Sequence, residues 1–518
     1  MSINERAQRK PSGRTVRWVG ALLVVLIAAW PTVAGFRAAN DDIKWVRTPD
    51  HELPVAEAIR LAWNTEASFR PLEVVVGHWC DAEALRCEAA IVVQAAGLLV
   101  LMLGVHRLCK TCMPDWPAAG IVAGVFLALS PATTCSTWQM DSCSQTWTAA
   151  LGAWAIVACL DALSAAQHGR MAWRTLAWLS VLFLLGCSLK ETFYGWSAGI
   201  GATSIISTAA LAARSRAAGL RSLWLLVPTI LLPLAHLGLR LSMGSLSERM
   251  HVDEGSRYQV ELGMNLVINA AMSIAGIFGV GPFHLATDDH AAPLLRILPY
   301  LAVAAAMFLV LGAVVLALVA KRVPAGIRMK PLAFACLASV LSLSATLPMG
   351  SVSELYGMGA NIGAALLLTA VLLALWKNDA PDERAIARTV AVACAGVIFS
   401  IGAYGLASRA LHFRIVWTTT DSLNRALLEF QQRLPAVQPD SGNASGLARF
   451  TALCINTRTY GQYVMPPAQA INSDITALWL ARHDPTRPIV FAIVPSPGVP
   501  AERELVFDCV DMPDHGHW

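Results

Sequence analysis

Two adjacent carboxylates, Asp41 and Asp42, follow the first long apolar run of the chain, within the stretch NDDIKW. A carboxylate within hydrogen-bonding reach of a hydroxyl can take its proton as the hydroxyl attacks, which is general-base catalysis. The second carboxylate of such a pair can orient the acceptor or bind a cation. The pair is therefore the candidate catalytic centre, with the order of the two roles left open. The alternative is the start of a solvated acidic loop.

The composition places most of this chain in a membrane. Of its 518 residues, 56% are hydrophobic and only 14% are charged, whereas soluble domains carry about 25% charged residues. Apolar runs of about 20 residues, the length that crosses the hydrocarbon core as a helix, recur along the sequence. The chain is therefore expected to be a polytopic helical membrane protein, and the carboxylate pair is expected just beyond the end of its first span.

Eleven apolar segments are expected to span the membrane, and basic loops orient them. Short loops rich in Lys and Arg stay in the cytoplasm, so the basic N-terminus, residues 1–17, is expected inside and the loop 37–88 outside. The first apolar run has no clear small-residue cleavage site and is interpreted as an uncleaved span. The predicted spans are residues 18–36, 89–107, 117–135, 145–163, 173–190, 192–212, 222–241, 296–320, 331–349, 357–376 and 387–406.

A twelfth apolar stretch, residues 264–283, is expected to be a re-entrant or surface helix. If it crossed the membrane once, the loop 321–330 would lie outside with four basic residues, against the usual distribution of charge. Its polar and small residues recur every three or four positions and would suit the wall of a wet cavity. The alternative is an ordinary span with a small-residue packing face. The face consists of Asn265, Asn269, Ser273, Gly276 and Gly279.

The membrane region, residues 18–406, is expected to precede an outer domain, residues 407–518. Asp421 is expected to start an amphipathic stalk helix. Strand-like RFTALCIN, a helix near 473–483, and strand-like RPIVFAIVP and ELVFDCV follow. The predicted fold class is an all-α polytopic membrane bundle of eleven spans plus a re-entrant or surface helix, with a small C-terminal extracytoplasmic α/β domain.

Six of the twelve cysteines lie in regions expected outside, two in each of three regions. An oxidising outer compartment favours disulfides there. Cys109 and Cys112 form an isolated C-x-x-C on the cytoplasmic side. Without two further ligands nearby, they are expected to be reduced thiols rather than a zinc site. The expected outer disulfides are Cys80–Cys87, Cys135–Cys143 and Cys454–Cys509.

Two features of the loop 37–88 would hold the carboxylate pair against the bundle. Residues 54–66 have the pattern of a helix that lies in the membrane interface. The turn Phe69–Leu72 follows, and its Arg70 could bridge to Asp41 or Asp42 and fix the loop.

Five segments, in chain order, resemble the GT-C superfamily of membrane glycosyltransferases, and within it the protein O-mannosyltransferase-like branch. NDDIKW followed by FRPL resembles the acidic pair and the aromatic-Arg-Pro-Leu turn of that family's first outer loop. LALSPATTCSTW, CSLKETFYGW, SELYGMGANIGAALLL and RALHFRIVW resemble its later motifs, and the likeness covers about residues 18–420. The sequence departs from the family where Ser130 replaces His, where Leu355 replaces Arg, and where an Arg expected after Trp138 is missing.

The resemblance implies a GT-C-like fold and a hexosyltransferase that moves a sugar from a polyprenyl-phosphate donor to an acceptor hydroxyl on the outer face. The leaving phosphate needs positive charge, and Lys190, Arg240 and Arg257 are the candidate donor-phosphate-binding residues. Arg70 and Glu191 are the candidate loop-positioning residues. The alternative for Lys190 is a surface ion pair with Glu191.

The implied partners are the polyprenyl-phosphate sugar, membrane lipid and a glycan, lipid or protein acceptor, in a bacterial inner membrane with the C-terminal domain outside. No pattern for binding nucleic acid is visible. A divalent cation is left open as a cofactor, with no metal ligands identified. Two other classes stay open. A lipid or polysaccharide flippase or transporter would more often show inverted repeats and mid-span charges, and the three departures from the family pattern are compatible with a catalytically silent scaffold of the same fold.

Overall fold

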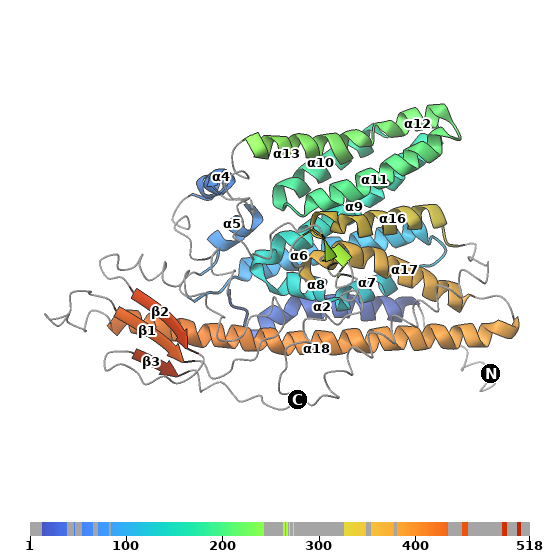
Figure 1. Ribbon diagram of the computed structural model, residues 1–518. Helices are drawn as coiled ribbons and strands as arrows, with labels where there is room; N and C mark the ends of the chain where they lie inside the picture. Colours follow the sequence, from blue (N-terminus) through green and yellow to red (C-terminus); the bar gives the residue numbers. More distant parts are fainter. Residues whose placement is uncertain are drawn as a thin grey trace.

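A computed structural model of the chain shows a bundle of helices packed side by side. The short helices α4 (Val55–Thr65) and α5 (Pro71–His78) lie toward one end of this bundle, which we name the outer end, and α12 lies toward the opposite, inner end (Figure 1). The structure describes residues 13–38, 46, 54–65, 71–81, 84–242, 263, 264, 266, 267, 269, 273, 326–348, 354–377, 381–433, 448–453, 489–494 and 505–508.

The apolar runs of the sequence form the helices of the bundle, because a backbone in lipid must satisfy its hydrogen bonds within the segment. The longer helices are α2 (Gly13–Ala34), α6 (Glu88–Cys112), α7 (Ala119–Leu129), α9 (Cys143–Gln167), α10 (Trp173–Leu189), α11 (Phe193–Ala212), α13 (Leu232–Ser242), α16 (Met329–Leu341), α17 (Met358–Trp376) and α18 (Pro381–Arg433). Short helical segments connect them: α8 (Pro131–Trp138), α12 (Arg216–Leu223), η2 (Met140–Ser142), η3 (Val227–Leu231), η5 (Ser342–Ala345) and η6 (Glu354–Gly357).

Five helical segments in the described part of the chain are long and apolar enough to cross a membrane, and a bent pair gives a sixth. Shorter apolar helices cover Gly20–Ala34, Trp173–Leu189 and Met329–Ala345. Each predicted span that falls on described residues coincides with helical structure. The chain therefore has the structure of a helical membrane protein. The predicted span 296–320 lies outside the described residues, so the number of eleven stays a prediction.

The predicted span 117–135 is a broken helix, not a straight one. α7 and α8 meet at an angle of 66°. Ser130 caps α8 by accepting a hydrogen bond from the Thr133 amide at 3.3 Å, and Pro131 follows it as the first helical residue. A proline has no N–H to continue the preceding helix, and its ring clashes with the turn before it. The break therefore follows from the Ser-Pro pair.

The inner ends of three segments lie together. The Arg328 amide donates to the Cys112 carbonyl at the end of α6 at 2.7 Å. The Lys377 ammonium lies 4.3 Å from the centre of the Trp116 ring, in the loop after α6. Residues near 328 are thus at the inner end, as the basic loop 321–330 was expected to be, whereas α13 ends beside the outer end of α10.

Parts of the predicted surface or re-entrant stretch 264–283 are described, and they support its polar face. The side chains of Asn269 and Ser273 are buried, whereas Met264 and Val267 are exposed. The Asn269 amide donates to the Leu347 carbonyl at 2.9 Å, near the outer end of the segment that contains α16. Asn265, Gly276 and Gly279, and the question of whether this stretch crosses, lie outside the described residues.

Helix α16 is held between α11 and α17 by small residues. Gly195 and Gly199 on α11 are four residues apart, as are Gly359 and Gly363 on α17. A Cβ at Gly195 or Gly199 would overlap the backbone of α16 and η5, and a Cβ at Gly359 would overlap the Ser342 side chain. Such small-x-x-x-small patterns let membrane helices approach closely. The centre of the bundle therefore depends on these glycines.

The C-terminal region differs from its prediction in one respect. α18 is continuous over Pro381–Arg433, so Asp421 lies inside this helix and does not start a separate one. The three expected strands are present as β1 (Ala448–Leu453), β2 (Ile489–Val494) and β3 (Leu505–Asp508), in a parallel sheet of order β2-β1-β3. The helix expected near 473–483 lies outside the described residues, and the α/β domain as a whole stays a prediction.

Candidate functional site

A buried carboxylate connects the first outer loop to the bundle. Glu73, on α5, is completely buried, accepts a hydrogen bond from the Ser144 amide at 3.1 Å, and also accepts one from the Ser144 hydroxyl. Ser144 lies in the first turn of α9, where backbone N–H groups have no partner within the helix and the helix dipole favours negative charge. Glu73 therefore caps α9 from another segment and fixes α5 at the outer end.

The next residue of α9 extends this polar contact toward the α10–α11 turn. The Gln145 side-chain oxygen accepts a hydrogen bond from the Thr192 hydroxyl at 3.2 Å. The turn, Lys190–Thr192, is tight, because a Cβ at Gly186 would meet the Phe193 ring. Lys190 is only 3% exposed. The turn that carries Lys190 and Glu191 is thus fixed in place next to the start of α9.

A hydrogen-bonded chain joins this turn to α13. The Tyr194 hydroxyl lies 2.8 Å from Nδ1 of His236, and Nε2 of the same ring lies 3.3 Å from the Ser188 hydroxyl. The Arg240 side chain lies within hydrogen-bonding reach of Tyr194, and Arg240 is 3% exposed. We name these four residues, together with the buried Lys190 of the adjoining α10–α11 turn, the cation cluster; Lys190 belongs to it by its place in that turn.

Arg240 places a fixed donor in the cation cluster. A guanidinium can only donate, so the Tyr194 oxygen accepts from Arg240. The guanidinium has five N–H groups, and such a donor-rich side chain suits an anionic ligand. The π-helical segment η3 precedes α13 and includes Pro228, and such segments change the register of a helix and often occur at functional sites.

A second group of residues fixes the start of the first outer loop. α2 ends at Gly35, whose φ of 76° is the left-handed conformation that glycine adopts readily. The Phe36 amide donates back to the Pro31 carbonyl at 2.8 Å, which closes the helix with a Schellman-type turn. The Ala38 amide then donates to the Leu85 carbonyl at 2.8 Å. The backbone path is therefore defined up to Ala38.

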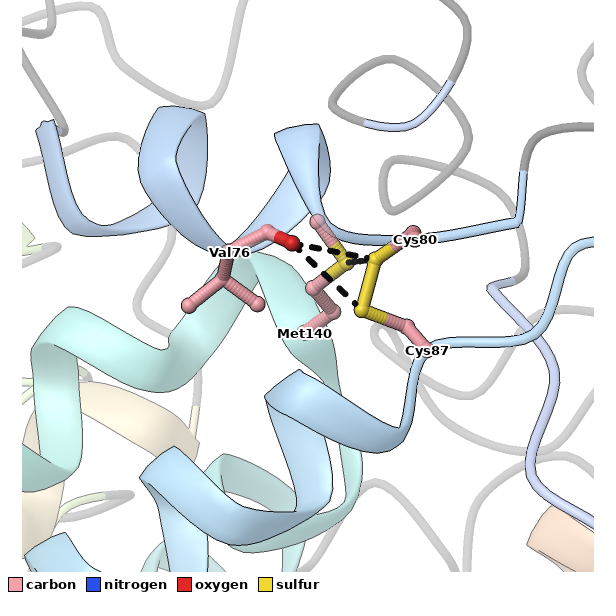
Figure 2. Close-up of a disulfide and its surroundings, with 4 residues drawn as sticks. All are labelled: Val76, Cys80, Cys87 and Met140. Carbon is pink, nitrogen blue, oxygen red and sulfur yellow. Dashed lines mark hydrogen bonds between the residues drawn. A yellow bond between two sulfur atoms is a disulfide. The ribbon is translucent and has the colours of Figure 1, made fainter. Parts of the chain in front are cut away.

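Leu85 lies inside a disulfide loop, and this confirms one of the expected bridges. Cys80 and Cys87 are joined, and their sulfurs lie near the Val76 carbonyl and the Met140 side chain at the outer end (Figure 2). Within the loop, Asp81 and Arg86 exchange two backbone hydrogen bonds, of 2.8 and 3.2 Å. The disulfide loop thus supports the segment that leads from α2 toward the carboxylate pair.

Two of the segments quoted from the sequence pack against each other. Arg409 on α18 is completely buried; its Nε donates to the Thr134 hydroxyl at 2.7 Å and its terminal nitrogen to the Leu129 carbonyl at 2.9 Å. Farther along α18, the Phe413 ring lies 5.6 Å from that of Trp138. LALSPATTCSTW and RALHFRIVW thus form one contact across the break between α7 and α8.

The structure brings together three of the predicted site residues. Lys190 and Glu191 share the α10–α11 turn, and the charges of both Glu191 and Arg240 act on Tyr194. Six other predicted residues, namely Asp41, Asp42, Arg70, Arg257, Cys454 and Cys509, lie outside the described residues. Among the described side chains, no group of three or more His, Cys, Asp and Glu could hold a metal ion.

The expected bridge between Cys135 and Cys143 is not formed. Both cysteines are buried and neither is part of a disulfide. The prediction assumed a short outer loop between them, but Cys135 is inside α8 and Cys143 is the first residue of α9. Cys109 and Cys112 are also buried and not disulfide-bonded.

The sequence interpretation gave no role to Glu73, Tyr194 and His236. A usable signal existed for His236, because ionisable residues within a membrane span indicate a functional site by default. Tyr194 is part of the quoted CSLKETFYGW but was given no role. The contact of α5 with α9 that buries Glu73 joins residues 71 positions apart, and no local pattern reports such a contact.

Comparisons with known proteins give little beyond this geometry. No known family profile matches the sequence, and no curated protein matches it. One solved structure that it resembles is the archaeal oligosaccharyltransferase AglB from Archaeoglobus fulgidus, in complex with an inhibitory peptide and a dolichol-phosphate. The match has a TM-score of 0.40 and 13% identity, and covers 90% of this chain and 68% of that chain. No family is assigned from a similarity of this size.

Proposed function

We propose that this chain is a membrane glycosyltransferase of the hexosyltransferase type. It would move a sugar from a polyprenyl-phosphate donor to an acceptor hydroxyl at the outer face of the membrane. The observation that supports this most directly is the cation cluster, in which Lys190 and Arg240 are each 3% exposed at the outer end of the bundle.

Two cations lie at this end of the bundle, one in the α10–α11 turn and one on α13. Charged residues in membrane segments generally mark a binding site or pathway, and a pair of cations suits a negatively charged ligand. The phosphate of a polyprenyl phosphate stays at the membrane surface while its tail stays in the bilayer. As the sugar leaves, negative charge develops on that phosphate, and Lys190 and Arg240 would stabilise it.

The remaining roles are assigned from the sequence. Asp41 or Asp42 would act as the general base for the acceptor hydroxyl, and Arg257 would be a third cation for the phosphate. Arg70 and Glu191 would position the loops that carry these groups. Glu191 suits this role because its charge acts on Tyr194, within the cation cluster.

Binding of the donor lipid tests the role that we give to the cation cluster. The full chain in lipid nanodiscs is titrated with a polyprenyl phosphate, and bound lipid is measured by native mass spectrometry. Lys190→Gln should weaken binding roughly tenfold, because a charged hydrogen bond of about 1.5 kcal/mol is lost. Lys110→Gln is the matched control, since Lys110 is exposed in the last turn of α6 at the inner end. Equal binding by the parent and Lys190→Gln would contradict the proposal.

Transfer of a labelled sugar from the same donor tests the chemistry. One of Asp41→Asn and Asp42→Asn should lower the rate by about 10²–10⁴-fold, the usual contribution of a general base, without changing polyprenyl-phosphate binding. A flippase would instead move the lipid between leaflets without transfer. A silent scaffold would show neither activity in the parent protein.

A further inference from the structure

We propose that Asp421 of α18 is a positioning residue that latches the start of the first outer loop through Arg37. The latch consists of Phe36 and Arg37 after α2 and of Trp417 and Asp421 on α18. The evidence for the contact is the distances between these four residues and the exposures of their side chains. Its effect on catalysis rests on the proposed function, because the candidate base lies only a few residues beyond Arg37.

The ion pair in the latch is close and partly shielded from water. Nε of Arg37 donates to Oδ1 of Asp421 at 2.8 Å, with side-chain exposures of 12% and 30%. The Arg37 guanidinium also donates to the Phe36 carbonyl at 2.9 Å. The other carboxylate oxygen of Asp421 contacts Arg425 at 3.0 Å, but the Arg425 side chain is 72% exposed. The Asp421 carboxylate thus pairs with a shielded arginine, Arg37, and with an exposed one, Arg425. Substitution of Arg425 is therefore the control for substitution of Arg37.

The aromatic part of the latch continues a single face of α18. Arg409, Phe413, Trp417 and Asp421 recur every four residues, so they lie along one side of the helix. The Trp417 ring lies 5.4 Å from that of Phe36 and 5.6 Å from that of Phe413, both edge-on or tilted. The face of α18 that contacts the broken span through Arg409 therefore also contacts the end of α2 through Trp417 and Asp421.

The backbone around Arg37 allows the latch to act on the residues that come after it in the chain. Gly35 turns the chain out of α2, and the Phe36 and Ala38 amides are bonded to Pro31 and Leu85. Arg37 lies between these two hydrogen-bonded amides. Without the ion pair, the segment would be held only by its contact with the disulfide loop. The hydrogen bonds of the Phe36 and Ala38 amides should therefore open more often.

The first experiment measures the latch without any assay of activity. Hydrogen exchange of peptides covering Phe36 and Ala38 is followed on the full chain in nanodiscs. Asp421→Asn and Arg37→Gln should each speed this exchange roughly tenfold, the equivalent of one charged hydrogen bond. Arg425→Gln should leave it unchanged. Exchange that is equally slow in all three variants would overturn the latch.

Reversal of the two charges shows whether faster exchange comes from loss of the ion pair or from a disturbance of the fold by the substitutions. In an Arg425→Gln background, where an arginine at 421 meets no like charge one turn away, Arg37→Glu combined with Asp421→Arg should restore slow exchange. Either reversal alone should not. A double variant that exchanges as fast as the single reversals would show that the ion pair does not fix this segment.

The second experiment asks whether the latch serves catalysis. With a polyprenyl-phosphate sugar, Asp421→Asn should lower kcat several-fold and leave the KM for the donor unchanged, because the cation cluster is intact. The charge-reversed double variant should regain kcat. Faster exchange with an unchanged kcat would overturn the positioning role. No transfer by the parent protein would instead reject the proposed function and leave the hydrogen-exchange result standing.

Discussion

Two helices of the bundle, α13 and α18, each bury an arginine, and the partners of the two differ. Arg409 on α18 donates to the Leu129 carbonyl and the Thr134 hydroxyl. Arg240 on α13 lies instead among Tyr194, His236 and Cys187, on whose side chains its charge acts. One guanidinium is bonded to the backbone of a broken span, and the other is surrounded by polar side chains of neighbouring helices.

This difference shows that burial of a cation does not identify a binding site by itself. Irregular backbone within a membrane protein needs internal partners for its freed polar groups, and Arg409 meets that need where Pro131 interrupts α7 and α8. Its hydrogen bonds are committed to the fold. The Arg240 guanidinium is hydrogen-bonded to a neighbouring side chain, Tyr194, and not to the backbone of an interrupted helix. Arg409 is therefore expected to control stability, and Arg240 ligand binding.

Arg409→Met should have the largest effect on stability. Methionine keeps the apolar length of the side chain but removes both donors, so the Leu129 carbonyl and the Thr134 hydroxyl lose a charged partner. Each such bond is worth about 1.5 kcal/mol or more, and the free energy of unfolding should fall by about 3 kcal/mol. Thermal unfolding in detergent measures this as a lower Tm.

Arg414→Met is the control for that measurement, since Arg414 is exposed on the same helix. It should leave Tm within error of the parent value. If Arg409→Met unfolds at the temperature of the control, Arg409 does not hold the broken span, and the contrast with Arg240 is lost.

Arg240→Gln should show the opposite profile, with a smaller effect on stability than Arg409→Met. Glutamine can still hydrogen-bond to Tyr194, but the positive charge is gone. Polyprenyl-phosphate binding should weaken roughly tenfold, the equivalent of about 1.4 kcal/mol in the charged contact. Native mass spectrometry in nanodiscs and thermal unfolding of the same sample check both parts. A large fall in Tm with unchanged binding would reverse the assignment of the two arginines.

The helices could be predicted from sequence because length and apolar composition determine a membrane span. The sequence predictions were wrong at helix breaks and helix starts, about which length and apolar composition give no information. Pro131 breaks the span 117–135, although the apolar run continues across it. The start of a helix was predicted at Asp421 from an amphipathic pattern, yet no proline follows Pro381 until Pro435, and nothing in the sequence interrupts α18 between them.

Disulfides and side-chain contacts could be predicted only between residues that are close in sequence. Cys80 and Cys87 are seven residues apart and form the expected bridge. Cys454 and Cys509 lie outside the described residues, and their bridge stays a prediction. Sequence patterns proposed Lys190 and Arg240 as phosphate ligands. The contact that brings α13, which carries Arg240, beside α10 joins Ser188 to His236 across 48 residues, and no spacing rule reports it.

Tyr194→Phe should have the smallest effect and gives the finest test of the contrast between the two arginines. It removes the hydroxyl between Arg240 and His236 and keeps the ring, so one hydrogen bond worth about 0.5–1.5 kcal/mol is lost. Polyprenyl-phosphate binding should weaken about two- to tenfold, with Tm almost unchanged. If Tyr194 acts by orienting Arg240, the substitution should add little to Arg240→Gln, since residues in one network are not additive. The same substitution should add fully to Arg409→Met in Tm, because the hydrogen bonds described for the two sites share no residue. Full additivity of Tyr194→Phe and Arg240→Gln in binding would mean that Arg240 contacts the phosphate independently of the hydrogen-bonded chain.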